Sequence, residues 1–274
     1  MTKLTSILVT LLLTTIVFTS YAQKGDGDFY AFDENFKTVN SLDVATYFLN
    51  VRKDADSVFV CRYYQKNGPM LRQETYKDKT LKIKHGRFVW YNEGGKVDST
   101  GIFVNGLKDG DFDHYDDTLG TIDTYAYKNG LLEFHKDHIK KFIYYANGNV
   151  EDLNLKSNIA DTSSKIFTTV QIESEFNGGQ KAWSKYVGKN FAIPKRYEAI
   201  VGRKGGRGKV TGYFTVDKIG KIGDVWLARS CEWSVDIEAI KVFKNGPDWT
   251  PAIQNGVKVK SRKRQDISFI VDPY

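Results

Sequence analysis

Two stretches decide the fold of the N-terminal half: Gly86-Arg87-Phe88-Val89-Trp90-Tyr91 and, 24 residues later, Gly110-Asp111-Phe112-Asp113-His114-Tyr115. The pair Asn105-Gly106 recurs at the same spacing as Asn129-Gly130. Apolar and polar residues alternate around these stretches, which is the pattern of half-buried β-strands. Asn-Gly pairs readily adopt the positive φ angles that tight hairpin turns require. Each unit is therefore predicted to be a β-hairpin.

Less regular copies extend this pattern on both sides. Aromatic pairs followed by glycine also occur at Tyr63-Tyr64 with Gly68 and at Tyr144-Tyr145 with Gly148. Because one hairpin cannot bury its own aromatic face, stacked copies must share a sheet. Residues 57–150 are therefore predicted to form an antiparallel meander of hairpins. The spacing of their aromatic residues and glycines resembles that of MORN-type repeats and, more closely, that of the degenerate repeats of bacterial YwqK-type antitoxin proteins. From this resemblance we carry over only the fold.

The repeats are flanked by sequence with less pattern. Residues 23–56 form a lead-in, in which Asp43–Val51 is compatible with a short helix or a strand. Residues 151–174 are polar, with Asn, Ser, Thr and Asp concentrated over 157–164. This composition is typical of a loop, so the segment is predicted to link two domains.

After the linker the pattern changes to mixed helices and strands. A helix is predicted over Gln180–Lys189, and a second from an N-cap at Ser234 to Phe243. Strands are predicted over Val210–Val216, Ile222–Ala228 and Val257–Val271. The whole chain is therefore expected to belong to the α+β class.

This order of elements resembles the TonB C-terminal domain family, the periplasmic module of energy-transducing proteins of Gram-negative bacteria. The matching residues, in order, are Phe176-x-Gly178-Gly179, Ala182-Trp183, Tyr186, Pro194, Gly208-x-Val210, Phe214-x-Val216-Asp217, Gly220-x-Ile222, Cys231, Asp236-x-Glu238-Ala239-Ile240, Pro247-x-Trp249-x-Pro251-Ala252 and Asn255-Gly256-Val257. The resemblance covers about 95 residues. For residues 175–274 it implies two helices on a small three-stranded antiparallel sheet.

The resemblance also implies a mode of binding. In TonB domains the last strand lies at an open sheet edge and pairs with a short segment of an outer-membrane transporter, so that main-chain hydrogen bonds supply affinity. The residues carried over to this role are Val257, Lys258, Val259, Lys260, Ser261, Arg262, Lys263 and Arg264. Four of them, Lys258, Lys260, Arg262 and Arg264, are expected to project from one face. They would form either an electrostatically selective docking edge or a guard against aggregation.

The charge distribution also separates the two halves. Residues 176–274 carry 19 Lys and Arg against 9 Asp and Glu, a net charge of +10, whereas the rest of the chain has a net charge of −3. A basic C-terminal half favours an acidic protein surface or anionic envelope material as partner. An export signal argues against nucleic acid. A basic surface that serves only solubility is the alternative.

The N-terminus has the layout of a secretory signal peptide. Lys3 precedes an apolar run from Leu4 to Phe18, and Ser20-Tyr21-Ala22 places small residues at the −3 and −1 positions before Gln23. The run is shorter than the ~20 residues of a spanning helix, so we expect residues 1–22 to be removed. A periplasmic or other cell-envelope location follows, with no membrane span after cleavage. The alternative is an uncleaved N-terminus that anchors the protein in the inner membrane.

Two features of a working energy transducer are missing from this pattern. With 5 Pro in 274 residues, the chain has no Pro-rich rod to reach across a periplasm, and hairpin repeats stand in its place. Cleavage of the signal peptide would also remove any membrane helix that could receive energy. Only the binding half of the TonB role is therefore expected to transfer.

No arrangement of residues predicts catalysis. His135 and His138, beside Glu133 and Asp137, lack a third metal ligand at a recognisable spacing. No nucleophile motif or paired-carboxylate signature occurs. The sequence therefore predicts a protein that is not an enzyme and that has no cofactor and no metal.

Two further features are interpreted as structural. Cys61 and Cys231 fall in separate predicted domains, so unpaired thiols are favoured over a disulfide, which needs two rigidly docked partners. The basic, glycine-rich stretch Gly202–Lys209 has no phosphate-loop spacing and is expected to be a mobile loop.

Two functions remain in competition at this point. The first is a binding module that docks a peptide, or a segment of a TonB-dependent outer-membrane transporter, by strand addition and so contributes to transmembrane transport. The second is a structural or interaction protein whose aromatic hairpins bind peptidoglycan, another glycan or a protein.

Overall fold

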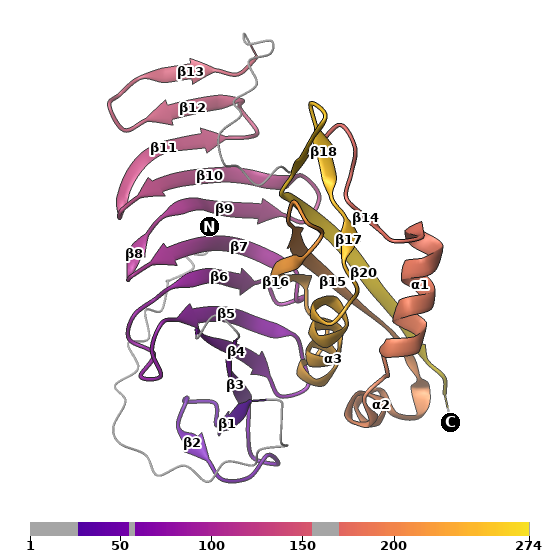
Figure 1. Cartoon of the computed structure of the whole chain (residues 1–274). Coiled ribbons are helices and arrows are strands. Elements are labelled where there is room, and N and C mark those ends of the chain that lie inside the picture. The colour runs from indigo at the N-terminus through magenta and orange to yellow at the C-terminus, as the bar shows by residue number, and fades with distance from the viewer. Residues whose placement is uncertain (1–26, 55–57, 155–169, 274) are drawn as a thin grey trace.

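The chain folds into a large antiparallel sheet and a smaller α+β unit that packs against one face of it (Figure 1). This computed structural model describes residues 27–54, 58–154 and 170–273. The predicted signal peptide and the centre of the predicted linker lie outside the described residues. The α+β class expected from the sequence is confirmed.

The large sheet is a nearly continuous meander of thirteen strands. Its order is β13-β12-β11-β10-β9-β7-β6-β5-β4-β3-β1-β2, with the short β8 paired to β7. The strands are β1 (Asp28–Phe32), β2 (Thr38–Val39), β3 (Tyr47–Lys53), β4 (Phe59–Gln65), β5 (Met70–Tyr76), β6 (Gly86–Tyr91), β7 (Val97–Val104), β8 (Leu107–Lys108), β9 (Gly110–Asp116), β10 (Gly120–Lys128), β11 (Leu131–Asp137), β12 (Phe142–Tyr145) and β13 (Val150–Asp152). The sheet therefore begins in the predicted lead-in, where the segment left open between helix and strand contributes to β3.

The sequence repeat appears in the sheet as a repeated turn. Asn105 and Gly106 have φ angles of 50° and 90°, and Asn129 and Gly130 have φ angles of 49° and 86°. Consecutive turns are also joined, because the Gly106 N–H donates to the Lys84 carbonyl and the Gly130 N–H to the Lys108 carbonyl, both at 2.8 Å. The units thus stack turn on turn as well as strand on strand.

Aromatic residues of the repeats form their own cluster on one face of this sheet. The rings of Phe88, Phe103, Phe112 and Tyr127 follow one another with centroids 4.6, 5.3 and 5.3 Å apart. Gly101 makes room for this row, since a Cβ there would lie 2.2 Å from the Phe112 ring. The cluster contains only residues of the N-terminal half.

The C-terminal unit places helices on a three-stranded antiparallel sheet of order β16-β15-β20. Its elements are β14 (Glu175–Phe176), α1 (Gly179–Asn190), α2 (Lys195–Val201), a 3₁₀ turn (Gly202–Lys204), β15 (Gly206–Val216), β16 (Ile222–Arg229), α3 (Trp233–Lys244), β17 (Trp249–Thr250), β18 (Ala252–Gln254), β19 (Val257–Val259) and β20 (Ser261–Val271). Short ladders join β14 to β17 and β18 to β19. The predicted helices over 180–189 and 234–243 and the hairpin over 210–228 are confirmed.

Three local predictions differ from the structure. Helix α2 was not predicted, because it has only seven residues, and it begins directly after Pro194. Glu232, not Ser234, is the N-cap of α3, and its side chain accepts a hydrogen bond from the Ser234 N–H. The stretch Gly202–Lys209 is not a loop, because its second half belongs to β15 and pairs with the end of β20.

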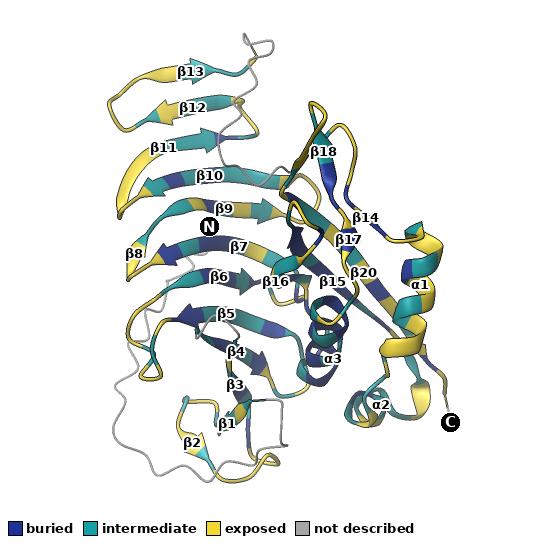
Figure 2. Ribbon diagram, viewed as in Figure 1, coloured by how far each residue is buried: buried dark blue, intermediate teal, exposed yellow. Residues whose placement is uncertain are grey.

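Helix α3 is buried along most of its length (Figure 2). On one side Phe243 packs near Phe214 of β15, with ring centroids 5.9 Å apart. On the other side Trp233 lies 6.5 Å from Phe48 of the large sheet. One apolar cluster therefore continues from the C-terminal unit into the inner face of the repeats. The two predicted domains consequently share a core.

The contact between α3 and β15 leads to a paired prediction. A Cβ on Gly212 would lie 2.5 Å from the Phe243 ring, whereas a Cβ on Gly188, in exposed α1, meets no atom within 4 Å. Gly212→Ala should lower the free energy of unfolding by about 1–3 kcal/mol. Gly188→Ala, the control, should raise it by about 0.5–1 kcal/mol, because glycine is a poor helix former. Urea denaturation measures both, and an unchanged midpoint for Gly212→Ala would contradict this packing.

Candidate functional site

Strand β20 lies at an edge of the C-terminal sheet. It pairs with β15 along its full eleven residues, from Ser261 opposite Val216 to Val271 opposite Gly206. Within the described part of the chain, no strand pairs with its other side. An edge strand of this kind presents main-chain N–H and C=O groups that a further strand can use.

The predicted binding residues are divided between two strands. Val257–Val259 form β19 and turn back onto β18, Lys260 lies between strands, and Ser261–Arg264 begin β20. The expectation of one strand from Val257 to Val271 was therefore wrong. The strand is interrupted at Lys260 because Ser261 is buried, and its Oγ lies 3.2 Å from the Ser174 Oγ.

The basic side chains also do not share one face. Because side chains alternate along a strand, Arg262 and Arg264 lie on one face of β20 and Lys263 on the other. Lys258 belongs to β19 and is not part of this row. The Arg264 side chain is 58% exposed and its nearest carboxylate partner, Asp266, is 3.9 Å away. Of the expected row, Arg264 is thus the most available cation on β20.

Aromatic packing holds the far end of β20 in place. The ring of Phe269 lies 5.3 Å from that of Phe191 and 5.5 Å from that of Tyr197. Gly208, the residue opposite Phe269 on β15, is required here, since a Cβ would lie 2.0 Å from the Phe269 ring. These contacts hold β20 against the packed interior, and this packing supports its outer edge.

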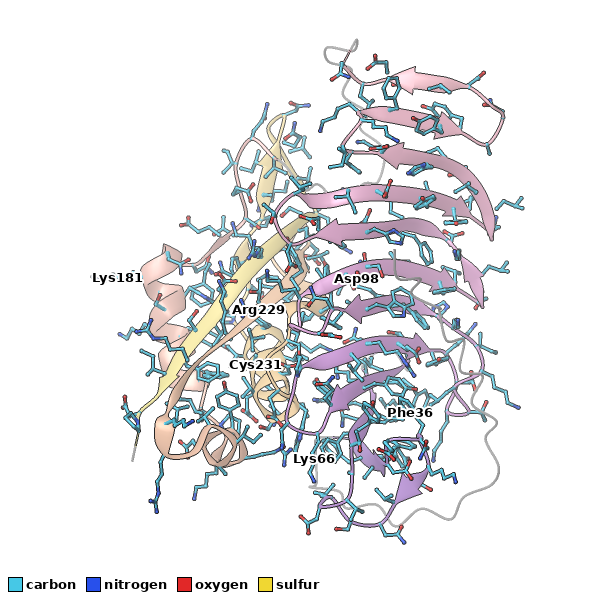
Figure 3. All side chains as sticks on the ribbon, turned by 180° about the vertical axis from the view of Figure 1, so that it is seen from behind. Phe36, Lys66, Asp98, Lys181, Arg229 and Cys231 are labelled. Carbon is cyan, nitrogen blue, oxygen red and sulfur yellow. The ribbon has the colours of Figure 1, made fainter. Side chains whose placement is uncertain are left out.

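The opposite edge of the same sheet is docked against the repeats. The Tyr91 hydroxyl donates to the Leu227 carbonyl at 2.8 Å. The Ser230 N–H donates to the Gly95 carbonyl at 2.8 Å, and the Met70 N–H donates to the Ser230 Oγ at 2.7 Å. Figure 3 shows this boundary, which we call the seam, with Arg229 and Cys231 beside it.

An ion pair crosses the seam. Arg87 of β6 donates to both carboxylate oxygens of Asp224 on β16, at distances from 2.6 to 3.2 Å, and its side chain is only 8% exposed. Burial would raise the pKa of Asp224, but Arg87, followed by Arg262 and Lys260, holds that pKa below its usual value. Two of the cations expected to meet a partner therefore also stabilise the charge of a carboxylate in the same chain.

Two acidic residues are buried at the start of α3. Asp236 is fully buried and accepts hydrogen bonds from the Cys231 N–H at 2.9 Å and from the Ser230 hydroxyl. Burial raises the pKa of Asp236 to about 7, against the effect of these hydrogen bonds. Glu232 is 1% exposed and pairs with Arg196 at 2.8 Å. Arg196 also donates to the Lys66 carbonyl at 2.6 Å, so this cluster spans the seam as well.

The histidines and cysteines have structural surroundings. His135 Nε2 lies 2.6 Å from Asp123, and His138 Nε2 lies 2.9 Å from the Thr124 hydroxyl. In the described residues, no group of three or more His, Cys, Asp or Glu side chains could hold a metal ion. Cys61 is a free thiol inside the aromatic cluster of the repeats, and Cys231 is a free thiol at the seam.

Through resemblance the sequence predicted an edge strand near the C-terminus, but it did not predict the seam. Contacts such as Arg87 to Asp224 join residues far apart in the chain, and no local pattern predicts them. One weak signal was present, because inward-facing polar residues such as Arg87 interrupt the apolar alternation of the repeats.

Comparisons with known proteins give no relative for this chain. No protein-family model, no curated protein and no solved structure matches it. None of the helices in the described residues has the length and apolar character needed to cross a bilayer.

The buried Asp236 predicts a pH effect of defined sign. Its pKa is raised from 3.8 to about 7 on folding, so between these values the folded state binds more protons than the unfolded state. Its contribution to stability therefore falls as the pH rises through this window, and the full penalty is present above pH 7. Asp236→Asn cannot titrate. From pH 5 to pH 8 the free energy of unfolding of the wild type should fall by about 2.5 kcal/mol relative to the variant.

Urea denaturation of both proteins at several pH values measures this difference. Groups that titrate equally in the two proteins cancel in the comparison. A difference that stays constant from pH 5 to pH 8 would show that Asp236 does not titrate as described.

Proposed function

We propose that this protein is an exported cell-envelope binding protein whose C-terminal unit acts as a TonB-like module. The unit captures an extended segment of a partner protein, by resemblance one belonging to a TonB-dependent outer-membrane transporter, through strand addition to the outer edge of β20. The observation that carries the proposal is the position of β20, an eleven-residue strand with a described partner on one side only.

The energetics of such an edge favour a peptide ligand. Each main-chain hydrogen bond to a captured strand contributes about 0.5–1.5 kcal/mol net, so several of them in register give measurable affinity. Packing of Phe269 and of Ile267, which is 1% exposed, keeps β20 extended before the ligand arrives. Binding to a preorganised edge costs less conformational entropy on the protein side.

Fewer basic side chains are available to select a ligand at this edge than the sequence pattern indicated. Arg262 and Lys260 help to lower the pKa of Asp224 through their charge, and Lys263 lies 3.5 Å from Glu173. Arg264 remains as the exposed cation beside the edge, where it both attracts an acidic residue of a ligand and discourages uncontrolled pairing. The two interpretations of the basic residues are therefore compatible.

The packing of the aromatic side chains in the repeats favours a structural role over glycan binding. Sugar recognition by aromatic side chains uses open ring faces, but the rings here cover one another. Tyr125 stacks on His135 at 4.3 Å with an interplanar angle of 4°, and His135 stacks on Tyr144 at 5.7 Å. Binding of peptidoglycan or another glycan by the repeats is the alternative function, and this stacking makes it the second choice.

Backbone-methylated peptides test strand addition directly. A labelled peptide, with the sequence of the short transporter segment that TonB domains bind, is titrated against the mature chain and followed by fluorescence anisotropy. Two matched versions carry N-methyl groups on alternate residues, one on the odd and one on the even positions. Because only every second N–H of a paired strand faces its neighbour, one version should bind at least about tenfold more weakly and the other nearly as well as the parent.

The two methylated peptides control for each other, since they have the same side chains and nearly the same mass. Equal weakening by both would indicate recognition that does not depend on strand pairing. Absence of binding by the parent peptide at millimolar concentration would remove the transporter segment as the partner.

Export predicts a defined mature N-terminus. If residues 1–22 are a signal peptide, the protein recovered from the cell envelope should begin at Gln23. Intact-mass spectrometry of the purified protein measures this. A mass that includes residues 1–22, together with recovery in the inner-membrane fraction, would favour the anchored form instead.

A further inference from the structure

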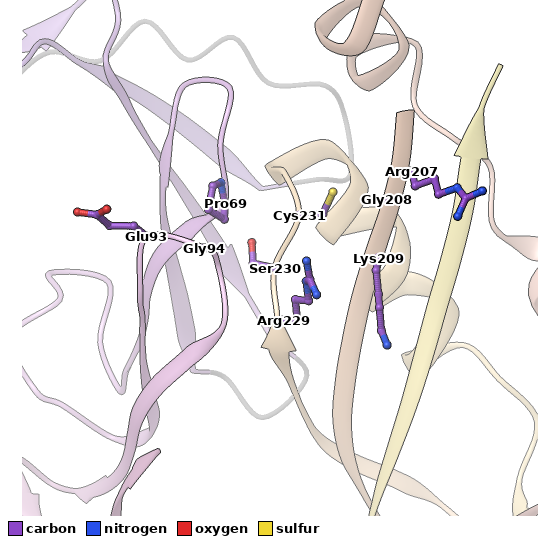
Figure 4. A pocket seen from close by; sticks show the side chains of 9 residues that line it. All are labelled: Pro69, Glu93, Gly94, Arg207, Gly208, Lys209, Arg229, Ser230 and Cys231. Carbon is purple, nitrogen blue, oxygen red and sulfur yellow. The ribbon is translucent and has the colours of Figure 1, made fainter. Parts of the chain in front are cut away.

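A pocket opens at the seam, next to the end of β16 (Figure 4). Its volume is about 180 Å³. Pro69 and Gly94 line it from the repeats, and Arg207, Lys209, Arg229 and Cys231 line it from the C-terminal unit. The pocket is therefore built by both halves of the chain and lies on the opposite side of β15 from the β20 edge.

The charges around this pocket are mostly positive. The lining residues include three cations, Arg207, Lys209 and Arg229, and one carboxylate, Glu93. In Figure 4 the Glu93 side chain points away from the other charged groups, while the Arg229 guanidinium extends into the space in front of Ser230 and Cys231. The pocket therefore has an excess of positive charge near its centre.

The cations differ in how far they are already satisfied. Lys209 is 2.7 Å from Asp266, so its charge is largely balanced within the protein. For Arg229 and Arg207, the described residues provide no ion pair within 4.0 Å. Figure 4 shows Arg207 extending across β20, which leaves Arg229 as the cation directed into the pocket.

The size of the pocket suits a small group. At about 30 Å³ for each water molecule, 180 Å³ corresponds to about six waters, which is enough for one phosphate or carboxylate group with part of its carrier. Gly94 lines the wall with backbone alone. A guanidinium binds such oxyanions with two parallel hydrogen bonds.

We propose that the seam pocket binds the oxyanion group of a small ligand, a phosphate or a carboxylate, with Arg229 as its principal contact. This site is independent of strand capture at β20. Because both halves of the chain line it, a bound ligand holds them together, and binding energy adds to the stability of the folded protein.

Inorganic phosphate and succinate are the probes, with sodium chloride at matched ionic strength as the reference. Thermal unfolding of the full mature chain should show a saturable rise in midpoint with at least one of the two anions, and isothermal titration should give the affinity. A saturable rise with only phosphate, or with only succinate, identifies the chemical class of the natural ligand. In either case Arg229→Gln should weaken binding by about tenfold or more.

Lys218→Gln is the matched control, because Lys218 is an exposed cation in the turn between β15 and β16, outside the pocket. It should bind like the wild type. Both variants alter exposed side chains, and equal midpoints without ligand verify that they fold. If neither anion gives a saturable shift beyond that of chloride, or if Arg229→Gln and Lys218→Gln bind equally, the proposal is overturned.

Discussion

Burial of helix α3 between two sheets is the constraint on which the rest of the structure depends. A helix at a protein surface needs one apolar face, but α3 has buried residues from Ser234 to Phe243 on several faces. The small sheet β16-β15-β20 covers only part of that surface. The inner face of the repeats covers another part, through residues such as Phe48 and Tyr64. The C-terminal unit and the repeats therefore stabilise each other, and the apolar cluster that they share is larger than either could form alone.

Apolar contacts alone do not fix how two such surfaces align, because they are non-directional. At the seam the orientation is set by directional hydrogen bonds. The Arg87 guanidinium donates to the Asp224 carboxylate, the Tyr91 hydroxyl donates to the Leu227 carbonyl, and the Ser230 hydroxyl donates to the buried Asp236. A buried charge carries a desolvation cost, which the partners of Asp236 offset only in part. Their presence here is consistent with a role in register, since each group is satisfied in one arrangement of the two halves.

The sequence predicted those parts of the fold that local spacing determines. The Asn-Gly turns and the alternation around Phe88 and Phe112 predicted the hairpins, and the periodicity over 234–243 predicted α3. It could not predict the seam, whose hydrogen bonds join residues 130 to 160 positions apart. The edge position of β20 depends on strand order, which a pattern does not encode, and it was expected only through resemblance. The break at Lys260 was missed because burial of Ser261 against Ser174 is also a long-range contact.

The seam also explains why one edge of the small sheet remains open. A three-stranded sheet has two edges, and each is a site of unwanted pairing unless something covers it. The edge formed by β16 is covered, because Asp224, Leu227 and the adjoining Ser230 all contact the repeats, and Arg229 forms an isolated bridge with Lys96. Docking through β16 directs β20 away from that contact, with β15 between them. The same interaction that joins the two halves thus leaves β20 accessible, and a strand captured there would be connected through β15 and β16 to the whole repeat sheet.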